Sequence, residues 1–418
     1  MKYPSVLGVT LLLAVLMLVP RNRLSAQTGQ PVNASRAAGK DIGAKINGLI
    51  TNCAGAYCSI YVPSGTYNFT TPIELSSNIE LSGAGQDKTI LIYTALQPGA
   101  GGPATKAATT TAITAGSSTT KVKIHDLQLL GTQETIGSAA TYNNTQGIAL
   151  KGTYSSIDKV KVAHHWAYGF PIILSGSHNT LSNSHVEYGT FCIGLAGSYQ
   201  TISKNYVSNH YSAASKAEAP AVHYWDGIAS EGLSYSLIEG NTVEDNGQSG
   251  IYSGGNGGLS SHNKINNNIV QHNWNRGIDN GVTGHVTKEN GISSLTVTNN
   301  QVIDNLEDNI WLICVQQADV GGNRTEYTSN YPAFFGAKAT KTRSGIAVGD
   351  LCGDAPQDIS SNVSVTGNTV SDYQTKSVIG LNLNVKASST GNKFTGNTNN
   401  SIFYVAPSVA LKKNTVQK

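Results

Sequence analysis

Short aliphatic runs, each followed by an asparagine and then a valine, recur along most of this 418-residue chain. The clearest copy is Ile238, Asn241 and Val243, which a Gly-Ile pair follows at residues 250–251. Further copies begin at Ile202, Ile265, Val297, Val365 and Leu411, degenerate ones at Val320 and Ser389, and copies without the asparagine at Ile124, Ile157 and Leu181. The closest copies begin roughly 21 to 24 residues apart, a period that is typical of a solenoid.

The pieces between these asparagines predict strands and tight turns rather than helices. Helical repeats would sustain apolar spacings of three and four over ten or more residues. Here the apolar runs are short and broken by Gly, Asn and Ser, and they lack the several leucines per unit of a leucine-rich repeat. We expect the asparagines to adopt the left-handed backbone of a sharp turn and to hydrogen-bond from coil to coil. The pattern predicts an all-β, single-stranded parallel β-helix of roughly ten coils.

The first residues predict a targeting segment and then a cap. An apolar run from Val6 to Val19 follows Lys2, and Leu24-Ser25-Ala26 offers a cleavage site, so residues 1–26 are interpreted as a signal peptide of an exported (secreted or periplasmic) protein. A membrane anchor is the alternative. Apolar residues at helical spacing within 40–52 predict a helix that covers the open end of the solenoid. The expected organisation is a cap over 27–54 and a β-helix over 55–418.

The segment after the predicted helix resembles a known family. Residues 60–67 read Ile-Tyr-Val-Pro-Ser-Gly-Thr-Tyr, and a Gly-Ala-Gly turn follows at 83–85. This Pro-x-Gly-x-Tyr segment leading to a Gly-x-Gly turn resembles the opening of the pectate-lyase-like superfamily of right-handed parallel β-helices. The resemblance implies the fold and its right hand. It leaves the reaction open, because that superfamily contains lyases, glycosidases, epimerases and non-catalytic spikes.

Composition and charge argue against some classes of binding partner. The formal net charge is +3 and only 13% of residues are charged. Without residues 1–26, basic and acidic residues are equal in number, so nothing indicates electrostatic capture of nucleic acid or of an anionic membrane. The expected partner is a polysaccharide, and the oligomeric state is left open.

Five cysteines in an exported chain predict disulfides. Cys53 and Cys58 would close a short loop, and Cys314 and Cys352 would bridge neighbouring coils, whose equivalent positions lie ~5 Å apart. Cys192, within an apolar strand, is expected to stay a free thiol.

Insertions predict where a ligand would bind. Residues 96–120 are expected to form a surface loop. Four further insertions, at 209–224, 252–262, 281–294 and 326–344, flank the recurrent Gly-Ile strand on consecutive coils. Loops on both sides of one stack of strands would wall a groove, although neutral drift of insertions into surface turns is the alternative.

Aligning the coils on the Gly-Ile pair places two columns of side chains in this predicted groove. The turn column contains Asp226, Ser249, Arg276 and Asp308, and the strand column contains Ala229, Tyr252, Asp279 and Trp311. Charges in the core of a narrow β-helix would be very costly, so the turn column is expected to point outward. Asp279 should lie ~4.8 Å from both Tyr252 and Trp311, and aromatic rings beside a carboxylate suit a sugar.

We therefore predict Asp226, Arg276 and Asp279 as catalytic residues. The predicted substrate-binding residues are His223, Trp225, Tyr252, Glu307, Asp308 and Trp311. A surface ion pair between Arg276 and Asp308 is the alternative for the turn column, turn capping for Asp226, and ordinary packing for the two aromatic residues.

The chemistry stays open between hydrolysis and elimination. Polygalacturonases of the superfamily carry Asn-Thr-Asp-Gly, Asp-Asp and Gly-His-Gly on successive coils, and only the Asp226-Gly227 part of the first motif is present here. Asp226 and Asp308 should be ~14 Å apart, beyond the ~6.5–9.5 Å of an inverting glycosidase. A lyase would need a cation for a uronate, which Arg276, helped by Lys264 or Lys288, could supply without metal. No cofactor is required, and calcium held by Asp226 and Asp279 is a second option.

Two functions from different classes follow. The first is an exported enzyme that cleaves or modifies a polysaccharide, as a lyase or a glycosidase. The second is a non-catalytic β-helix that binds carbohydrate or acts as an adhesive surface protein. The clustered insertions and the Tyr252, Asp279 and Trp311 column favour the enzyme, whereas the missing catalytic motif favours the binder.

Overall fold

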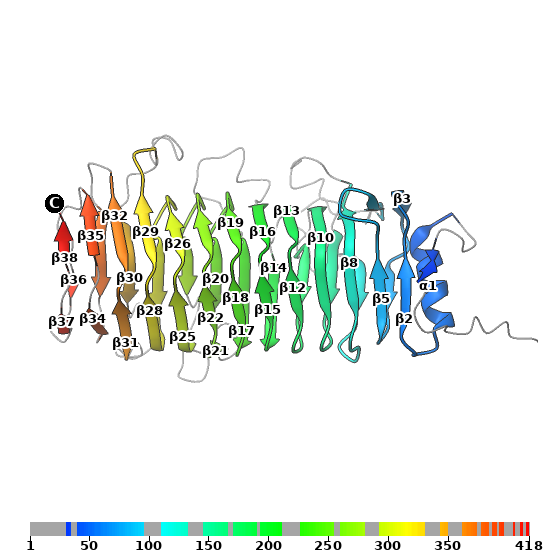
Figure 1. Ribbon diagram of the computed structural model, residues 1–418, viewed down its shortest axis with the longest axis horizontal. Coiled ribbons are helices and arrows are strands. Elements are labelled where there is room, and N and C mark those ends of the chain that lie inside the picture. The colour runs from blue at the N-terminus through cyan, green and yellow to red at the C-terminus, as the bar shows by residue number, and fades with distance from the viewer. Residues whose placement is uncertain are drawn as a thin grey trace, which may run out of the picture.

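The structure is a computed structural model in which 38 strands, each parallel to its neighbours, form one long solenoid (Figure 1). It describes residues 31–34, 40–95, 110–132, 145–165, 170–189, 193–210, 226–254, 260–280, 292–330, 343–349 and 362–373, and the backbone of further strands between 378 and 417. The predicted parallel β-helix is confirmed. Among the described residues, no helix is long and apolar enough to cross a membrane.

The strands fall into three sheets, each adding one strand per coil. Sheet 1 contains β4 (Ile73–Leu75), β7 (Thr110–Ala115), β9 (Thr145–Leu150), β11 (Ile172–Leu174), β14 (Ile193–Ser198), β17 (Ile228–Ser234), β20 (Ile251–Gly254), β24 (Ile278–Asn280), β27 (Ile310–Ile313), β30 (Arg343–Gly349), β33 (Val378–Leu383) and β36 (Tyr404–Val405).

Sheet 2 contains β1 (Val32–Asn33), β2 (Cys58–Tyr61), β5 (Ile79–Ser82), the first part of β8 (Lys123–Leu130) and of β10 (Ser156–His165), β12 (Thr180–Ser182), β15 (Thr201–Ser203), β18 (Leu237–Glu239), β22 (Lys264–Asn266), β25 (Ile292–Thr298), β28 (Val315–Gly321), β31 (Val363–Thr366), β34 (Ala387–Thr390) and β37 (Ala410–Lys412), with β21 (Ser260–Ser261) between β17 and β25.

Sheet 3 contains β3 (Gly65–Phe69), β6 (Thr89–Tyr93), the second part of β8 and β10, β13 (His185–Gly189), β16 (Tyr206–His210), β19 (Thr242–Glu244), β23 (Ile269–Gln271), β26 (Gln301–Ile303), β29 (Arg324–Tyr327), β32 (Thr369–Asp372), β35 (Lys393–Gly396) and β38 (Thr415–Gln417). The solenoid has more coils than the roughly ten expected, because its first and last turns lack the full repeat.

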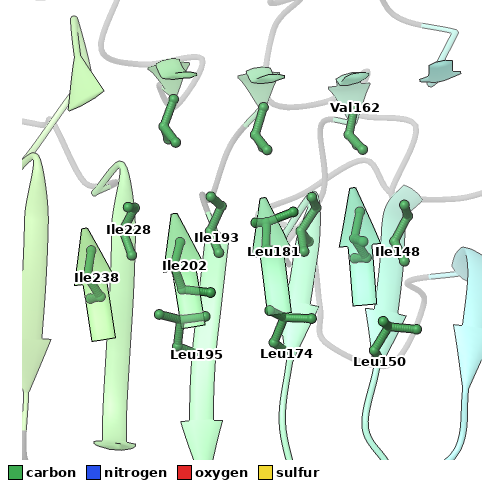
Figure 2. Packing of buried hydrophobic residues seen from close by; sticks show 14 of the residues in the cluster. Ile148, Leu150, Val162, Leu174, Leu181, Ile193, Leu195, Ile202, Ile228 and Ile238 are labelled. Carbon is green, nitrogen blue, oxygen red and sulfur yellow. The ribbon is translucent and has the colours of Figure 1, made fainter. Parts of the chain in front are cut away.

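The repeats of the sequence stack in register. Ile202 pairs with Ile238, which pairs with Ile265, and even the degenerate copy at Ser389 pairs with Val365. Because alternate side chains of a strand point to one face, each coil sends its aliphatic residues into the centre. Figure 2 shows these inward columns, with Ile193 above Leu195 on one coil and Ile148 above Leu150 on another. The result is one continuous aliphatic core along the axis.

The asparagines of the repeat form the expected hydrogen-bonded ladder between sheets 2 and 3. Nδ2 donates to Oδ1 of the next coil in each successive pair of Asn205, Asn241, Asn268, Asn300, Asn323 and Asn368, at 2.9 to 3.0 Å. The expected left-handed backbone is instead one residue earlier. Gly240 and Asn267, which precede two of these asparagines, have φ of 62° and 56°. The ladder asparagine needs its side chain turned inward, so the residue before it makes the turn.

The turn between sheets 1 and 2 carries a second, exposed ladder. Five coils place an aromatic or imidazole ring there, stacked with centroids 4.5 to 5.3 Å apart, in the order Tyr154, His178, Tyr199, Tyr235, His262. All five residues have positive φ. Stacking of such rings contributes ~0.5–1.5 kcal/mol per pair and offsets that backbone cost.

The predicted cap is confirmed as α1 (Ile42–Asn52), which lies at the N-terminal end of the solenoid (Figure 1). Ile42, Ile46 and Ile50 lie four residues apart and are buried against the first coil. The Asp41 side chain caps the helix by accepting from the Ala44 N–H at 2.9 Å. The helix thereby covers the open end of the aliphatic core.

Two further predictions have mixed outcomes. The Cys53–Cys58 disulfide is confirmed, with Cα atoms 5.9 Å apart. Cys314 is buried and disulfide-bonded, but Cys352 and Cys192 lie outside the described residues, so the predicted pairing stays a prediction. The expected loop over 96–120 is wrong in its second half, because 110–115 form strand β7. Its small alanines hid the strand pattern. Residues 1–26 also lie outside the described residues.

Candidate functional site

The turn that leads into sheet 1 carries the predicted turn column in register. The N–H of Gly227 donates to the carbonyl of Ser249, that of Gly250 to Arg276 and that of Gly277 to Asp308, at 2.9 to 3.1 Å. The next bond of this series runs from Asn309 to Ser344, so Ser344 extends the column by one coil.

Glycine follows this turn column because the chain packs tightly there. A Cβ on Gly250 would lie 2.3 Å from Cγ1 of Val270, and one on Gly277 would lie 2.3 Å from Cγ1 of Val302. Such distances are well inside van der Waals contact, so the Gly of the Gly-Ile pair is required by the valine of sheet 3. The same close packing fixes the height of each turn residue along the axis.

The strand column is also in the expected register. Tyr252 pairs with Ala229 on one side and Asp279 on the other, and Asp279 pairs with Trp311. Asp279, however, is only 3% exposed, although an exposed position was expected. Neighbouring side chains from the turn column cover it, so it is buried without pointing into the aliphatic core.

Ser249 brings the two predicted catalytic carboxylates together. Its N–H donates to Oδ1 of Asp226 at 3.0 Å, and its hydroxyl donates to Oδ2 of Asp279 at 2.9 Å. Two hydrogen bonds through one serine limit the separation of these carboxyl groups to about 9 Å. Both side chains therefore bend toward the intervening coil, on which Ser249 lies.

Arg276 is surrounded by acidic side chains rather than forming a simple pair. Its guanidinium lies 3.1 Å from Asp279, 3.5 Å from Glu307 and 3.9 Å from Asp308. The guanidinium carbon also lies 3.5 Å from the centroid of the Trp311 ring. The alternative Arg276–Asp308 ion pair is therefore present, but it is not a simple surface pair, because both side chains are mostly buried and Arg276 also contacts Asp279 and Glu307. We call Asp226, Ser249, Arg276, Asp279, Glu307, Asp308 and Trp311 the Arg276 cluster.

Burial raises the pKa of three aspartates of the Arg276 cluster. Burial and the charge of Asp279 raise the pKa of Asp226 to about 8. Burial raises the pKa of Asp308 to about 6 against the opposing effect of Arg276. Burial also raises the pKa of Asp279, while Arg276 and the Ser249 hydroxyl favour its charged form. A carboxyl group that holds its proton near neutral pH beside other carboxylates is the feature expected of an acid catalyst.

Several buried polar atoms near the cluster have no hydrogen-bond partner among the described residues. They are Oδ1 of Asp279, Nε of Arg276, Oδ1 of Asn275, Oγ of Ser253 and both amide atoms of Asn280. Buried polar groups are normally paired, and exceptions concentrate at functional sites. This concentration sets the cluster apart from the asparagine ladder.

The other predicted residues divide into three groups. Tyr252 lies beside Asp279, and one face of the Trp311 ring is covered by Arg276, which leaves less of that ring for a sugar. His223, Trp225 and Lys288 lie outside the described residues. Lys264 is on sheet 2, in register with Leu237 and Thr296, and cannot assist Arg276.

Sequence reasoning missed the role of Ser249, which stood in the turn column but drew no attention as a neutral residue. Its place between Asp226 and Arg276 was the available signal. The described residues contain no group of three or more His, Cys, Asp or Glu side chains that could hold a metal ion. They therefore offer no set of ligands for the calcium ion considered above.

Comparison with known proteins agrees with this architecture. Residues 146–325 match the family described as right handed beta helix region, and residues 34–224 match the family described as rhamnogalacturonase A/epimerase, pectate lyase-like. Together with the fold, these matches support a pectate-lyase-like right-handed parallel β-helix protein.

Individual proteins resemble it in part. The tail spike protein of Salmonella phage epsilon15 is 33% identical over 206 residues, which cover 45% of this chain and 19% of the phage protein. The chain therefore matches about a fifth of that relative's length.

Solved structures share the fold over most of the chain. The Dettilon tailspike protein has a TM-score of 0.67 and 22% identity, covering 92% of this chain and 68% of its own. The A-module of the Azotobacter vinelandii mannuronan C-5 epimerase AlgE6 has a TM-score of 0.64 and 14% identity, covering 92% and 99%. A DFA-IIIase from Arthrobacter chlorophenolicus A6, in complex with DFA-III, has a TM-score of 0.61 and 14% identity, covering 90% and 97%.

Proposed function

We propose that this chain binds a polysaccharide at the Arg276 cluster and hydrolyses it by acid catalysis, with Asp226 as the proton donor. The observation that supports this most is the pair of hydrogen bonds by which Ser249 joins Asp226 to Asp279. Burial and the charge of Asp279 raise the pKa of Asp226 to about 8, which leaves its carboxyl group protonated at neutral pH. Hydrolysis of a glycosidic bond needs a protonated acid beside a second carboxylate, and Ser249 holds Asp279 within reach.

The two carboxyl groups take different roles because their surroundings differ. Asp279 is bound by Arg276 and by the Ser249 hydroxyl, which favour its charge. In the described part of the chain Asp226 accepts from the Ser249 N–H and has no cation in contact. Between two neighbouring acids, the one without a cation keeps the proton. Asp226 is therefore the acid, and Asp279 is the charge that stabilises the oxocarbenium-like transition state.

The reaction is balanced by water. Asp226 gives its proton to the glycosidic oxygen as the bond from that oxygen to the anomeric carbon breaks. Water adds to the anomeric carbon and gives up a proton to an ionised carboxylate of the cluster. Asp226 then recovers its proton from solvent. No metal is required for any of these steps.

Elimination fits the same residues less well. A lyase or an epimerase must neutralise the carboxylate of a uronate. Arg276 was the predicted cation for that role, but its guanidinium already contacts three carboxylates and the Trp311 ring. The names of the similar proteins, which include tail spikes, a mannuronan epimerase and a DFA-IIIase, support a carbohydrate role in general.

The test is product analysis after incubation with a panel of polysaccharides. Hydrolysis releases new reducing ends without ultraviolet absorption, and Asp226→Asn should lower that release by ~10²–10⁴-fold. Asp319→Asn is the matched control, because Asp319 is an exposed aspartate on sheet 2. Unsaturated, ultraviolet-absorbing products would replace this proposal with a lyase. Binding without any product would replace it with the non-catalytic carbohydrate-binding alternative.

Export through residues 1–26 remains part of the proposal, because extracellular polysaccharides are reached only from outside the cytoplasm. Determining the N-terminal residue of the protein recovered from culture medium or periplasm tests it. A start at Gln27 supports the predicted cleavage after Ala26, whereas an uncleaved, membrane-bound chain contradicts it.

A further inference from the structure

The stacked rings in the turn between sheets 1 and 2 are exposed although they pack on one another. We call Tyr154, His178, Tyr199, Tyr235 and His262 the ring ladder. Tyr154 is 59% exposed, Tyr199 48% and Tyr235 50%. The described residues include seven exposed large apolar side chains, and these tyrosines are three of them. Single exposed apolar residues are ordinary, whereas a contiguous line of them marks a binding surface.

The fold does not require rings at this turn. All five ladder residues have a left-handed backbone, with φ between 51° and 58°. The turn between sheets 2 and 3 also has left-handed residues, and there the chain places Gly240, Asn267 and Gly322, among others. Gly and Asn adopt this backbone at little cost, whereas a bulky ring is strained in it. Stacking offsets that strain without exceeding it, so rings on five consecutive coils indicate a use for their side chains.

The ring ladder also presents polar atoms. The turns from Tyr154 to Tyr235 lie wholly within the described residues. In that part of the chain the three tyrosine hydroxyls have no hydrogen-bond partner. A column of hydroxyl side chains runs beside the rings, one residue earlier in each turn. Its members Thr153, Ser177 and Ser198 pair from coil to coil and are partly exposed. Each coil therefore offers hydroxyl groups that can both donate and accept.

We infer that the ring ladder and its hydroxyl column bind an extended polysaccharide that lies along the solenoid axis. Neighbouring rings from Tyr154 to Tyr235 are 4.6 to 5.3 Å apart, close to the advance of one sugar unit along an extended glycan. Successive sugars therefore meet successive coils. The exposed ring surfaces contact sugar C–H groups, and the phenol, serine and threonine hydroxyls exchange hydrogen bonds with sugar hydroxyls.

This surface is distinct from the Arg276 cluster. The cluster precedes sheet 1 and the ring ladder follows it, so the seven residues of β17, ~20 Å of extended chain, separate Asp226 from Tyr235. The inference takes the class of ligand from the proposed function, but it needs neither cleavage nor any residue of the cluster. A second line of contact would keep a long chain on the protein while the cluster acts on it.

The test removes first the hydroxyls and then the rings. One variant combines Tyr154→Phe, Tyr199→Phe and Tyr235→Phe, which keeps the stack. The other changes the same three tyrosines to Asn, which tolerates a left-handed backbone. Tyr188 on β13 of sheet 3 is the matched control, because it is also exposed, has φ of 50° and stacks on a ring. Thermal denaturation of each full-length variant separates a loss of binding from a loss of folding.

Affinity electrophoresis in gels that contain mannan, galactan, polygalacturonate or alginate measures binding. We expect at least one of these polysaccharides to retain the wild type. The Phe variant should bind it about three- to tenfold more weakly, and the Asn variant more than about tenfold, because hydrogen bonds and then contact surface are lost. Tyr188→Phe and Tyr188→Asn should bind like the wild type. If the Asn variant does not fold, the Phe variant decides.

Unchanged binding in the Phe variant and in a folded Asn variant contradicts the inference, and so does a wild type that none of the four polysaccharides retains. The outcome is separate from that of the proposed function. Weaker binding of the ladder variants without any product from the wild type keeps the inference and removes the hydrolase. Product formation that depends on Asp226, with normal binding by the ladder variants, keeps the hydrolase and removes the inference.

Discussion

Two turns of the solenoid bury polar side chains in opposite ways. In the turn between sheets 2 and 3, each asparagine of the ladder is fully hydrogen-bonded. Asn268, for example, donates to Asn300 and to the Ile238 carbonyl and accepts from Asn241. In the turn before sheet 1, Asp279, Arg276 and their neighbours keep buried polar atoms that have no hydrogen-bond partner in the described part of the chain.

The difference separates the residues that stabilise the fold from the residues that can take part in binding or catalysis. A satisfied network stabilises a coil and has nothing left to offer a ligand. An unsatisfied one costs stability and holds groups in uncommon charge states, as the pKa of Asp226 near 8 illustrates. We therefore expect substitutions in the ladder to affect folding first and substitutions in the Arg276 cluster to affect function first.

The largest expected effect is on the ladder. Asn268→Ala removes the acceptor of the Asn241 N–H and Nδ2, and it removes the side-chain donor to Asn300 Oδ1 and to the Ile238 carbonyl. It should lower the free energy of unfolding by about 3–5 kcal/mol. Urea denaturation measures this. Asn267→Gly, at the neighbouring left-handed position, is the control and should change stability by less than about 1 kcal/mol. Equal losses in both variants would show that the ladder has no special role.

The next effect concerns the Arg276 cluster and the pH dependence of hydrolysis. If Asp226 is the acid, the rate of hydrolysis should fall about tenfold per pH unit above its pKa of about 8, because the proton is then absent. Reducing-end release measured from pH 5 to pH 10 checks this, with stability followed by circular dichroism in parallel. A rate that stays constant to pH 10 in folded protein would exclude Asp226 as the donor.

The two regions also differ in how far the sequence predicts them. The ladder follows from the repeat, because a recurring asparagine beside aliphatic residues needs only the coil spacing to place it. The register of the turn column and of the strand column follows from the same alignment. What does not follow is the direction of each side chain within its column. Burial of Asp279 depends on Ser249 and Arg276 folding over it, and that contact has no signature in the spacing.

A smaller effect concerns a further column of asparagines in the turn after sheet 3, where Nδ2 of Asn246 donates to Asn273 and Nδ2 of Asn273 donates to Asn305. His210 is buried and its Nδ1 lies 2.8 Å from Oδ1 of Asn246, and burial lowers its pKa to about 4. The unfolded chain takes up a proton near pH 6.5 while the folded chain does not, so this histidine costs stability as pH falls from 6.5 toward 4. His210→Asn continues the asparagine column and should raise stability at pH 5 by about 2 kcal/mol relative to pH 8.

Thermal denaturation at the two pH values measures this difference. His185→Asn is the control, because the His185 side chain is half exposed, and it should show no such gain. A gain of equal size in both variants would mean that the buried site is not responsible.

The central claim, that the Arg276 cluster holds Asp226 in a costly protonated state, is tested most directly by the stability of Asp226→Asn as a function of pH. Burial and Asp279 raise the folded pKa from 3.8 to about 8, so the folded chain holds a proton that the unfolded chain releases within this range. Wild-type stability should therefore decline relative to Asp226→Asn between pH 4 and pH 8, by more than about 1 kcal/mol, and level off above. A difference between the two proteins that stays constant with pH, or that changes in favour of the wild type as pH rises, would contradict the account.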